Sequence, residues 1–138
     1  MRIMAIDYGD AHTGVALSDP TGFLAGSATT IHSRKAEVVL EELQKLVEQH
    51  QVEELVMGFP RNMDGTEGPR AELYREFAQK VEEATGLKPV LWDERRTTID
   101  AHQILFNSGK NAKKRKKVVD AVAASLILEG YLTYKRSH

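Results

Sequence analysis

The sequence predicts a mixed α/β domain that spans residues 1–138, and three observations support this fold class. Residues 1–32 contain three apolar or β-branched runs joined by short turns, which is typical of an antiparallel meander. Helical and strand patterns then alternate, and a strand reached through a helix is expected to lie parallel to its neighbour. No internal repeat or linker interrupts this order. The expected chain is therefore three strands, a helix, a strand, a helix, a strand and two helices.

The first predicted strand is apolar throughout residues 3–6, so both of its faces should be covered. It ends at Asp7, and an ionised carboxylate in a covered position is costly unless it has a partner. A polar turn over 9–14 and a second apolar run over 15–17 complete a hairpin. An ordinary hairpin with a solvent-facing Asp7 is the alternative interpretation. A further turn leads to a third strand, predicted over residues 23–32.

The following elements are predicted from helical spacing and from residues that begin or end helices. Ser33 is expected to cap a helix that runs to residue 50. Residues 52–59 form a buried strand, and residues 60–68 form a glycine-rich loop long enough to have a function. A helix then begins at Pro69 and is closed by Gly86. Its predicted inward-facing residues are Leu73, Phe77, Val81 and Ala84.

The last elements complete a five-stranded mixed sheet, three strands antiparallel and two parallel, flanked by helices. A fifth short strand covers residues 89–92, with Trp92 expected in the core. Thr97 or Thr98 is expected to cap a helix through residue 107. A final helix follows a break at 108–111 and is expected to reach Tyr134.

Charge and composition narrow the functional classes. The net charge of −1 does not by itself indicate a nucleic-acid binder, but one basic run contains no acidic residue and favours contact with phosphate. This run comprises Lys110, Lys113, Lys114, Arg115, Lys116 and Lys117. There is no cysteine, hence no disulfide and no thiolate metal site. We expect no signal peptide and no membrane span, because Asp7 and Asp10 interrupt the N-terminal apolar residues and no apolar run is long enough.

Three carboxylates on separate elements are the candidate catalytic and metal-binding residues. Asp7 ends the first strand and Glu94 follows the fifth, so both can reach the edge where parallel strands end. Asp120 shares a helix face with Ala123, Ala124 and Ile127, and the two alanines would allow close approach to the sheet. Asp93 is the alternative to Glu94, since side chains alternate along a strand. Either could instead pair with a neighbouring arginine, and Asp120 could pair with Lys116.

Oxygen ligands without histidine or cysteine suit Mg²⁺ or Mn²⁺. Two such ions about 4 Å apart activate a water molecule and stabilise the leaving oxygen in phosphodiester cleavage. The residues therefore predict a metal-dependent hydrolase that acts on nucleic acid.

In these and neighbouring motifs the sequence resembles the RuvX/YqgF family, whose members are described as pre-16S rRNA nucleases and Holliday junction resolvases. The resemblance covers nearly the whole chain in the family's order. The matching stretches are Asp7–Gly9 with Gly14–Ala16, then Gly58–Glu67, Trp92–Arg95, and Lys113–Ala124.

The resemblance implies an RNase H-like (RuvC-like) fold and nuclease chemistry through Asp7, Glu94 and Asp120. It implies a cytoplasmic role in maturing the 5′ end of 16S rRNA, with structured RNA as the binding partner. Phosphates would be held by Arg61, Arg95, Lys113, Lys114, Arg115, Lys116 and Lys117. The alternatives are a resolvase of four-way DNA and a non-catalytic RNA-binding assembly factor. The chain is expected to act as a monomer or a homodimer.

Overall fold

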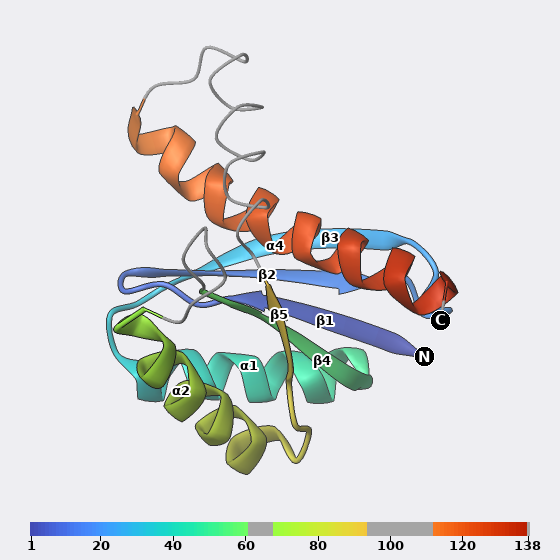
Figure 1. The fold of residues 1–138 in the computed structure, drawn as a ribbon, viewed down its shortest axis with the longest axis horizontal. Coiled ribbons are helices and arrows are strands. Elements are labelled where there is room, and N and C mark those ends of the chain that lie inside the picture. Colours follow the sequence, from blue (N-terminus) through green and yellow to red (C-terminus); the bar gives the residue numbers. More distant parts are fainter. Residues whose placement is uncertain (61–67, 94–111, 138) are drawn as a thin grey trace.

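The computed structural model describes residues 1–60, 68–93 and 112–137, with the backbone alone for 112–120 and 137. Its strands are β1 (Arg2–Asp7), β2 (His12–Ser18), β3 (Ala25–His32), β4 (Val52–Phe59) and β5 (Val90–Asp93). Its helices in this part of the chain are α1 (Ala36–His50), α2 (Arg70–Thr85) and α4 (Ala112–Ser137). Figure 1 shows these elements as one sheet with helices on both sides.

The strands form a five-stranded sheet in the order β3-β2-β1-β4-β5. Strand β2 pairs antiparallel with both β1 and β3, whereas β4 pairs parallel with both β1 and β5. The mixed sheet predicted from the sequence is therefore confirmed. Strand β1 occupies the centre, which explains why residues 3–6 are all buried.

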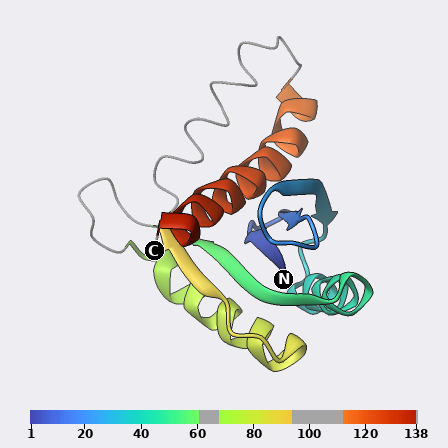
Figure 2. The same cartoon turned by 90° about the vertical axis from the view of Figure 1, so that its right-hand side faces the viewer.

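The two faces of the sheet are covered by different helices, as Figure 2 shows most clearly. Met4 and Ile6 of β1 belong to the core formed with α1 and α2. Ile3 and Ala5 point the other way, into the core formed with α4. This alternation assigns each position of β1 to one helix layer, because successive side chains of a strand point to opposite faces.

Helix α4 approaches the sheet closely through small residues. Ala124 and Ile127 are fully buried against Ala5 and Ala16, as the predicted alanine face required. Trp92 is half-buried rather than a central core residue, and its ring packs edge-on against Tyr131 at 5.7 Å. Burial, followed by the neighbouring charge of Glu54, raises the pKa of Tyr131 to about 12.

Several further details differ from the sequence prediction. Strand β3 begins at Ala25, leaving Phe23 in the preceding turn. Lys35 occupies the N-cap of α1, and the Ser33 hydroxyl instead accepts a hydrogen bond from the Lys35 amide at 3.1 Å, so the predicted cap is wrong. Leu73 of α2 is 43% exposed, and Tyr74 is buried in its place. Strand β5 extends to Asp93. The predicted helix over 97–107 and most of the loop 60–68 lie outside the described residues.

Candidate functional site

Asp7 ends the central strand at the edge of the sheet where three strands finish. It pairs with Gly14 of β2, and its side chain is half-buried. Because β1, β4 and β5 run parallel, their carboxyl ends meet at this edge. Edges of this kind are where parallel α/β sheets form binding sites.

The strand register shows which face of the sheet Asp7 belongs to. Asp7 follows Ile6, which pairs with Met57, so Asp7 is level with Gly58 and, one strand further, with Trp92. Along β1 it continues the series Ile3, Ala5, which faces α4. Asp7 is therefore placed on the α4 face, at the end of the sheet.

The same alternation separates the two acidic candidates after β5. Trp92 packs against α4, so the next residue, Asp93, lies toward the opposite face of the sheet. Asp93 is exposed.

The remaining predicted site residues are placed only in part. Glu94, Arg95 and Arg61 lie outside the described residues. Asp120 and the basic residues Lys113–Lys117 belong to the first turns of α4, where the structure describes the backbone alone. Within the described side chains, no group of three or more histidine or acidic residues could hold a metal ion. Asp7 itself is a carboxylate at a half-buried strand end, which is a donor that Mg²⁺ and Mn²⁺ accept.

The connection from β1 to β2, residues 8–11, is held by side chains of α2. The Tyr74 hydroxyl donates a hydrogen bond of 2.7 Å to the carbonyl oxygen of Tyr8. The ring of Tyr8 stacks on Phe77, with centroids 3.8 Å apart and planes 9° from parallel. Burial, followed by the charge of Asp10, raises the pKa of the Tyr8 phenol.

Arg70 makes the second contact between α2 and this connection. Its guanidinium lies 3.3 Å from the Asp10 carboxylate and 3.4 Å from the Tyr74 hydroxyl. Gly9 has no room for a side chain, since a Cβ there would lie 2.4 Å from the carbonyl oxygen of His12. Neither Tyr74 nor Arg70 was predicted from the sequence, because their partners are more than 50 residues away and no local pattern marks them.

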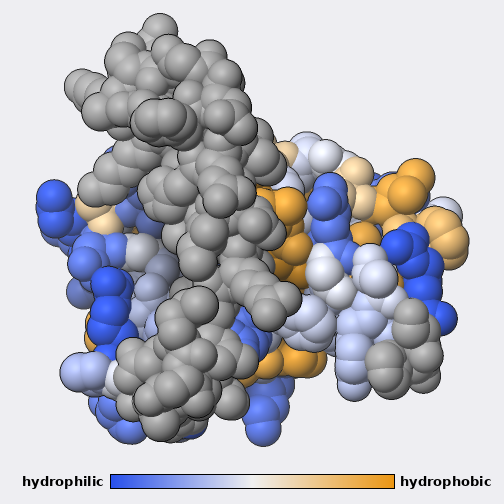
Figure 3. All heavy atoms as spheres, turned by 45° about the horizontal axis from the view of Figure 1, so that its top comes forward, coloured by the Kyte–Doolittle hydropathy of each residue, from blue (hydrophilic) through white to orange (hydrophobic). Residues whose placement is uncertain are grey.

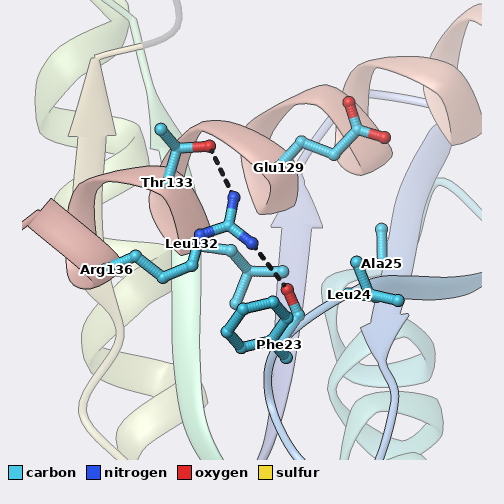
Figure 4. Close-up of a pocket in the computed structure, with 7 residues that line it drawn as sticks. All are labelled: Phe23, Leu24, Ala25, Glu129, Leu132, Thr133 and Arg136. Atoms are coloured by element: carbon cyan, nitrogen blue, oxygen red, sulfur yellow. Dashed lines mark hydrogen bonds between the residues drawn. The ribbon is translucent and has the colours of Figure 1, made fainter.

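A second feature lies at the other end of the sheet, between the turn before β3 and the last turns of α4. Arg136 lies over the ring of Phe23 at 4.9 Å and donates a hydrogen bond of 3.2 Å to its carbonyl oxygen (Figure 4). A shallow hollow of about 390 Å³ lies here, lined by Leu24, Leu132 and Thr133 among others. Figure 3 shows polar and apolar residues interspersed on the α4 side of the molecule. Across the part of the chain that the structure describes, no helix has the length and hydropathy needed to cross a membrane.

Comparison with solved structures identifies the class of fold. The chain superimposes on Thermus thermophilus RuvC in complex with its Holliday junction substrate with a TM-score of 0.57, at 11% identity over 96% of each chain. It superimposes on Fowlpox virus resolvase with its Holliday junction DNA with a TM-score of 0.58, at 13% identity over 98% of this chain and 99% of the other. The fold is thus that of RuvC-like resolvases, as predicted.

Sequence comparison identifies the family. The chain belongs to the RuvX family, whose model, described as Holliday junction resolvase, matches residues 1–134. A relative from Carboxydothermus hydrogenoformans, named "Putative pre-16S rRNA nuclease", is 48% identical over 98% of each chain. A relative of the same name from Clostridium botulinum strain Alaska E43 is 46% identical over 96% of each chain. The resemblance drawn from the sequence motifs is confirmed.

Proposed function

We propose that this chain is a metal-dependent nuclease that processes the 5′ end of pre-16S rRNA in ribosome biogenesis. The observation that carries the proposal is the placement of Asp7 on the α4 face at the carboxyl end of the central strand, in a member of the RuvX family. The names of the curated relatives support the choice of RNA substrate. A single RNase H-like nuclease domain over residues 1–138 that acts in the cytoplasm fits this role.

Asp7 would hold Mg²⁺ or Mn²⁺ together with Glu94 and Asp120. Position 120 lies one helical turn before Ala124, and Ala124 packs on the same face of the sheet as Ala5, which supports an approach of Asp120 to Asp7. Glu94 is preferred over Asp93 because alternation turns Asp93 away from α4. When bound, the metal supplies an activated water molecule and neutralises charge on the leaving oxygen.

The residues around the carboxylates would bind and orient the substrate backbone. Lys113, Lys114, Arg115, Lys116 and Lys117 precede Asp120 on the same helix, and Arg61 and Arg95 follow the ends of β4 and β5. Cations at this edge would hold phosphates, whereas the carboxylates alone would repel them.

The description of the family model favours a second candidate function, the resolution of four-way DNA junctions in recombination and repair. The two activities share their chemistry and differ in substrate. A third possibility is a non-catalytic RNA-binding assembly factor. It predicts no cleavage and no stabilisation by divalent metal.

The test compares wild type with Asp7→Asn on a precursor rRNA end and on a four-way DNA junction, with Mn²⁺ or Mg²⁺. We expect metal-dependent cleavage of the RNA by wild type and background cleavage by Asp7→Asn. Asp19→Asn is the matched control, because it makes the same change at the opposite end of the sheet and should retain activity. Equal cleavage by Asp7→Asn would contradict the proposal, and preferred cleavage of the junction would favour the resolvase.

A second measurement separates the nuclease from the assembly factor without relying on cleavage. A metal that binds the folded chain raises its melting temperature by mass action. We therefore expect millimolar Mn²⁺ to raise the melting temperature of wild type and of Asp19→Asn, but not of Asp7→Asn. The absence of any shift in wild type would favour the assembly factor.

A further inference from the structure

We propose that Tyr74 is a positioning residue of this site. It lies on the opposite face of the sheet from Asp7 and holds the backbone at Tyr8, the residue that follows Asp7. The inference rests on the proposed nuclease function. It concerns a residue on α2, which contributes no predicted ligand.

The contact with Tyr8 is specific and partly shielded from solvent. Tyr74 is only 5% exposed, and its hydroxyl lies 2.7 Å from the carbonyl oxygen of Tyr8. The two rings also meet edge-on, with centroids 5.5 Å apart. The phenol of Tyr74 therefore does more than fill space, because it holds one main-chain carbonyl at a defined place.

The other contacts of residues 8–11 also hold this connection in place. Phe77 holds the ring of Tyr8 by stacking, and Arg70 holds the carboxylate of Asp10. The amide of Ser33, which follows β3, donates a hydrogen bond of 3.1 Å to the carbonyl oxygen of Ala11. Both side chains of the Arg70–Asp10 ion pair are exposed, so the pair should contribute little to stability by itself. The partly buried hydrogen bond from Tyr74 is the contact we expect to matter most.

This contact reaches Asp7 through the covalent chain. Tyr8 is the next residue, so its ring and its carbonyl define the direction in which the chain leaves Asp7. Asp7 ends the regular pairing of β1, and its position then depends on the pairing with Gly14 and on how residue 8 is held. A displacement of about 1 Å in a reacting group can cost about a hundredfold in rate.

Tyr74 is not placed to act on substrate directly. Tyr8 belongs to the core formed with α1 and α2, whereas Asp7 continues the series that faces α4. Its hydroxyl already donates to a main-chain carbonyl on the α2 side. We therefore expect its loss to affect the geometry of the site and not the binding of nucleic acid.

The test is Tyr74→Phe, which keeps the ring and removes only the hydroxyl. We expect kcat for RNA cleavage to fall about tenfold, the equivalent of one lost hydrogen bond in the reacting geometry, with KM unchanged within about twofold. Amide hydrogen exchange at residues 8–11 should become faster. Tyr134→Phe is the matched control, because Tyr134 lies on α4 and is 48% exposed.

Both measurements are made well below the melting temperature of each variant, so that a loss of global stability does not enter. A wild-type kcat in Tyr74→Phe would overturn the proposal, and so would a change confined to KM. Equal effects of Tyr74→Phe and Tyr134→Phe on kcat would overturn it as well.

Failure of the proposed function gives a different result. If wild type shows no cleavage that depends on Asp7, the nuclease assignment fails, and hydrogen exchange still tests the anchoring of residues 8–11. Unchanged exchange in Tyr74→Phe would then overturn the positioning role independently.

Discussion

The antiparallel part of the sheet contains two connections that are held in opposite ways. Residues 8–11, between β1 and β2, depend on Tyr74, Phe77 and Arg70 of α2. Residues 19–24, between β2 and β3, are organised from within by Asp19, and they also contact Met1 and Arg136 of α4. The Asp19 carboxylate accepts hydrogen bonds from the Phe23 amide at 3.0 Å and the Thr21 hydroxyl at 2.9 Å.

The two connections therefore differ in the source of their side-chain contacts: Asp19 organises residues 19–24 largely from within, whereas side chains of α2 hold residues 8–11. Asp19 supplies the acceptor for three hydrogen bonds within the turn at 19–24. The turn at 8–11 receives side-chain contacts from α2, in addition to the main-chain hydrogen bond from Ser33. The proposed catalytic carboxylate, Asp7, immediately precedes the connection at 8–11. Its geometry therefore depends on an element more than 60 residues away in the chain.

The largest effect is expected from Phe77→Ala. Phe77 is 3% exposed and stacks on Tyr8, so its truncation should lower the free energy of unfolding by about 3–5 kcal/mol. Chemical denaturation measures this change. Hydrogen exchange should increase at residues 8–11 before it increases at 19–24. Equal loosening of both connections would remove the distinction between them.

The second largest effect is expected from two matched glycine substitutions, Gly9→Ala and Gly22→Ala. A Cβ on Gly9 would lie 2.4 Å from the His12 carbonyl oxygen, and a Cβ on Gly22 would lie 2.3 Å from that of Met1. Each alanine variant should lose about 2 kcal/mol of stability, because backbone atoms must move. Only Gly9→Ala should also reduce cleavage at a temperature where both variants are folded. Equal cleavage by the two would contradict the functional difference between the connections.

A smaller effect is expected from Asp19→Ala. The substitution removes the acceptor for the Phe23 and Leu24 amides and for the Thr21 hydroxyl. Thermal unfolding should show a melting temperature lower by a few degrees, with kcat for cleavage unchanged. A fall in kcat similar to that of Tyr74→Phe would show that the two ends of the sheet are coupled.

The smallest effect is the pH dependence of the turn at 19–24. The hydrogen bond from the Phe23 amide, followed by that from Thr21, lowers the pKa of Asp19 below 3.8. The folded state therefore favours the charged form. This contribution is complete above the ordinary aspartate range and is lost as the pH falls through the lowered pKa. Asp19→Asn should make the acid limb of the stability curve shallower, which denaturation between pH 2 and pH 5 would measure.

The sequence predicted the sheet well because its signals are local. Apolar runs, short turns and intervening helices define both the strands and their directions, and the turn residues 19–22 mark the connection that Asp19 organises. Asp7 was found in the same way, as a carboxylate after a fully apolar strand.

The contacts made by α2 could not be predicted in this way. Helical spacing gave Leu73 as an inward residue, since leucine is the more apolar neighbour, but Tyr74 is buried instead. A buried tyrosine hydroxyl needs a partner, and here the partner is the carbonyl oxygen of Tyr8, on a distant segment. The Ser33 cap is wrong for a different, local reason: α1 begins after Lys35, and the Ser33 hydroxyl accepts from the Lys35 amide before the helix starts.

The position of α4 has a consequence for biosynthesis. The helix follows every strand in chain order, yet it covers Ile3 and Ala5 of the first strand. A nascent chain on the ribosome can pair its strands and dock α1 and α2, but Ile3 and Ala5 lack the cover of α4 until that helix emerges. Asp7 lies at the end of that face, so a translation intermediate lacking α4 would leave the proposed catalytic centre incomplete.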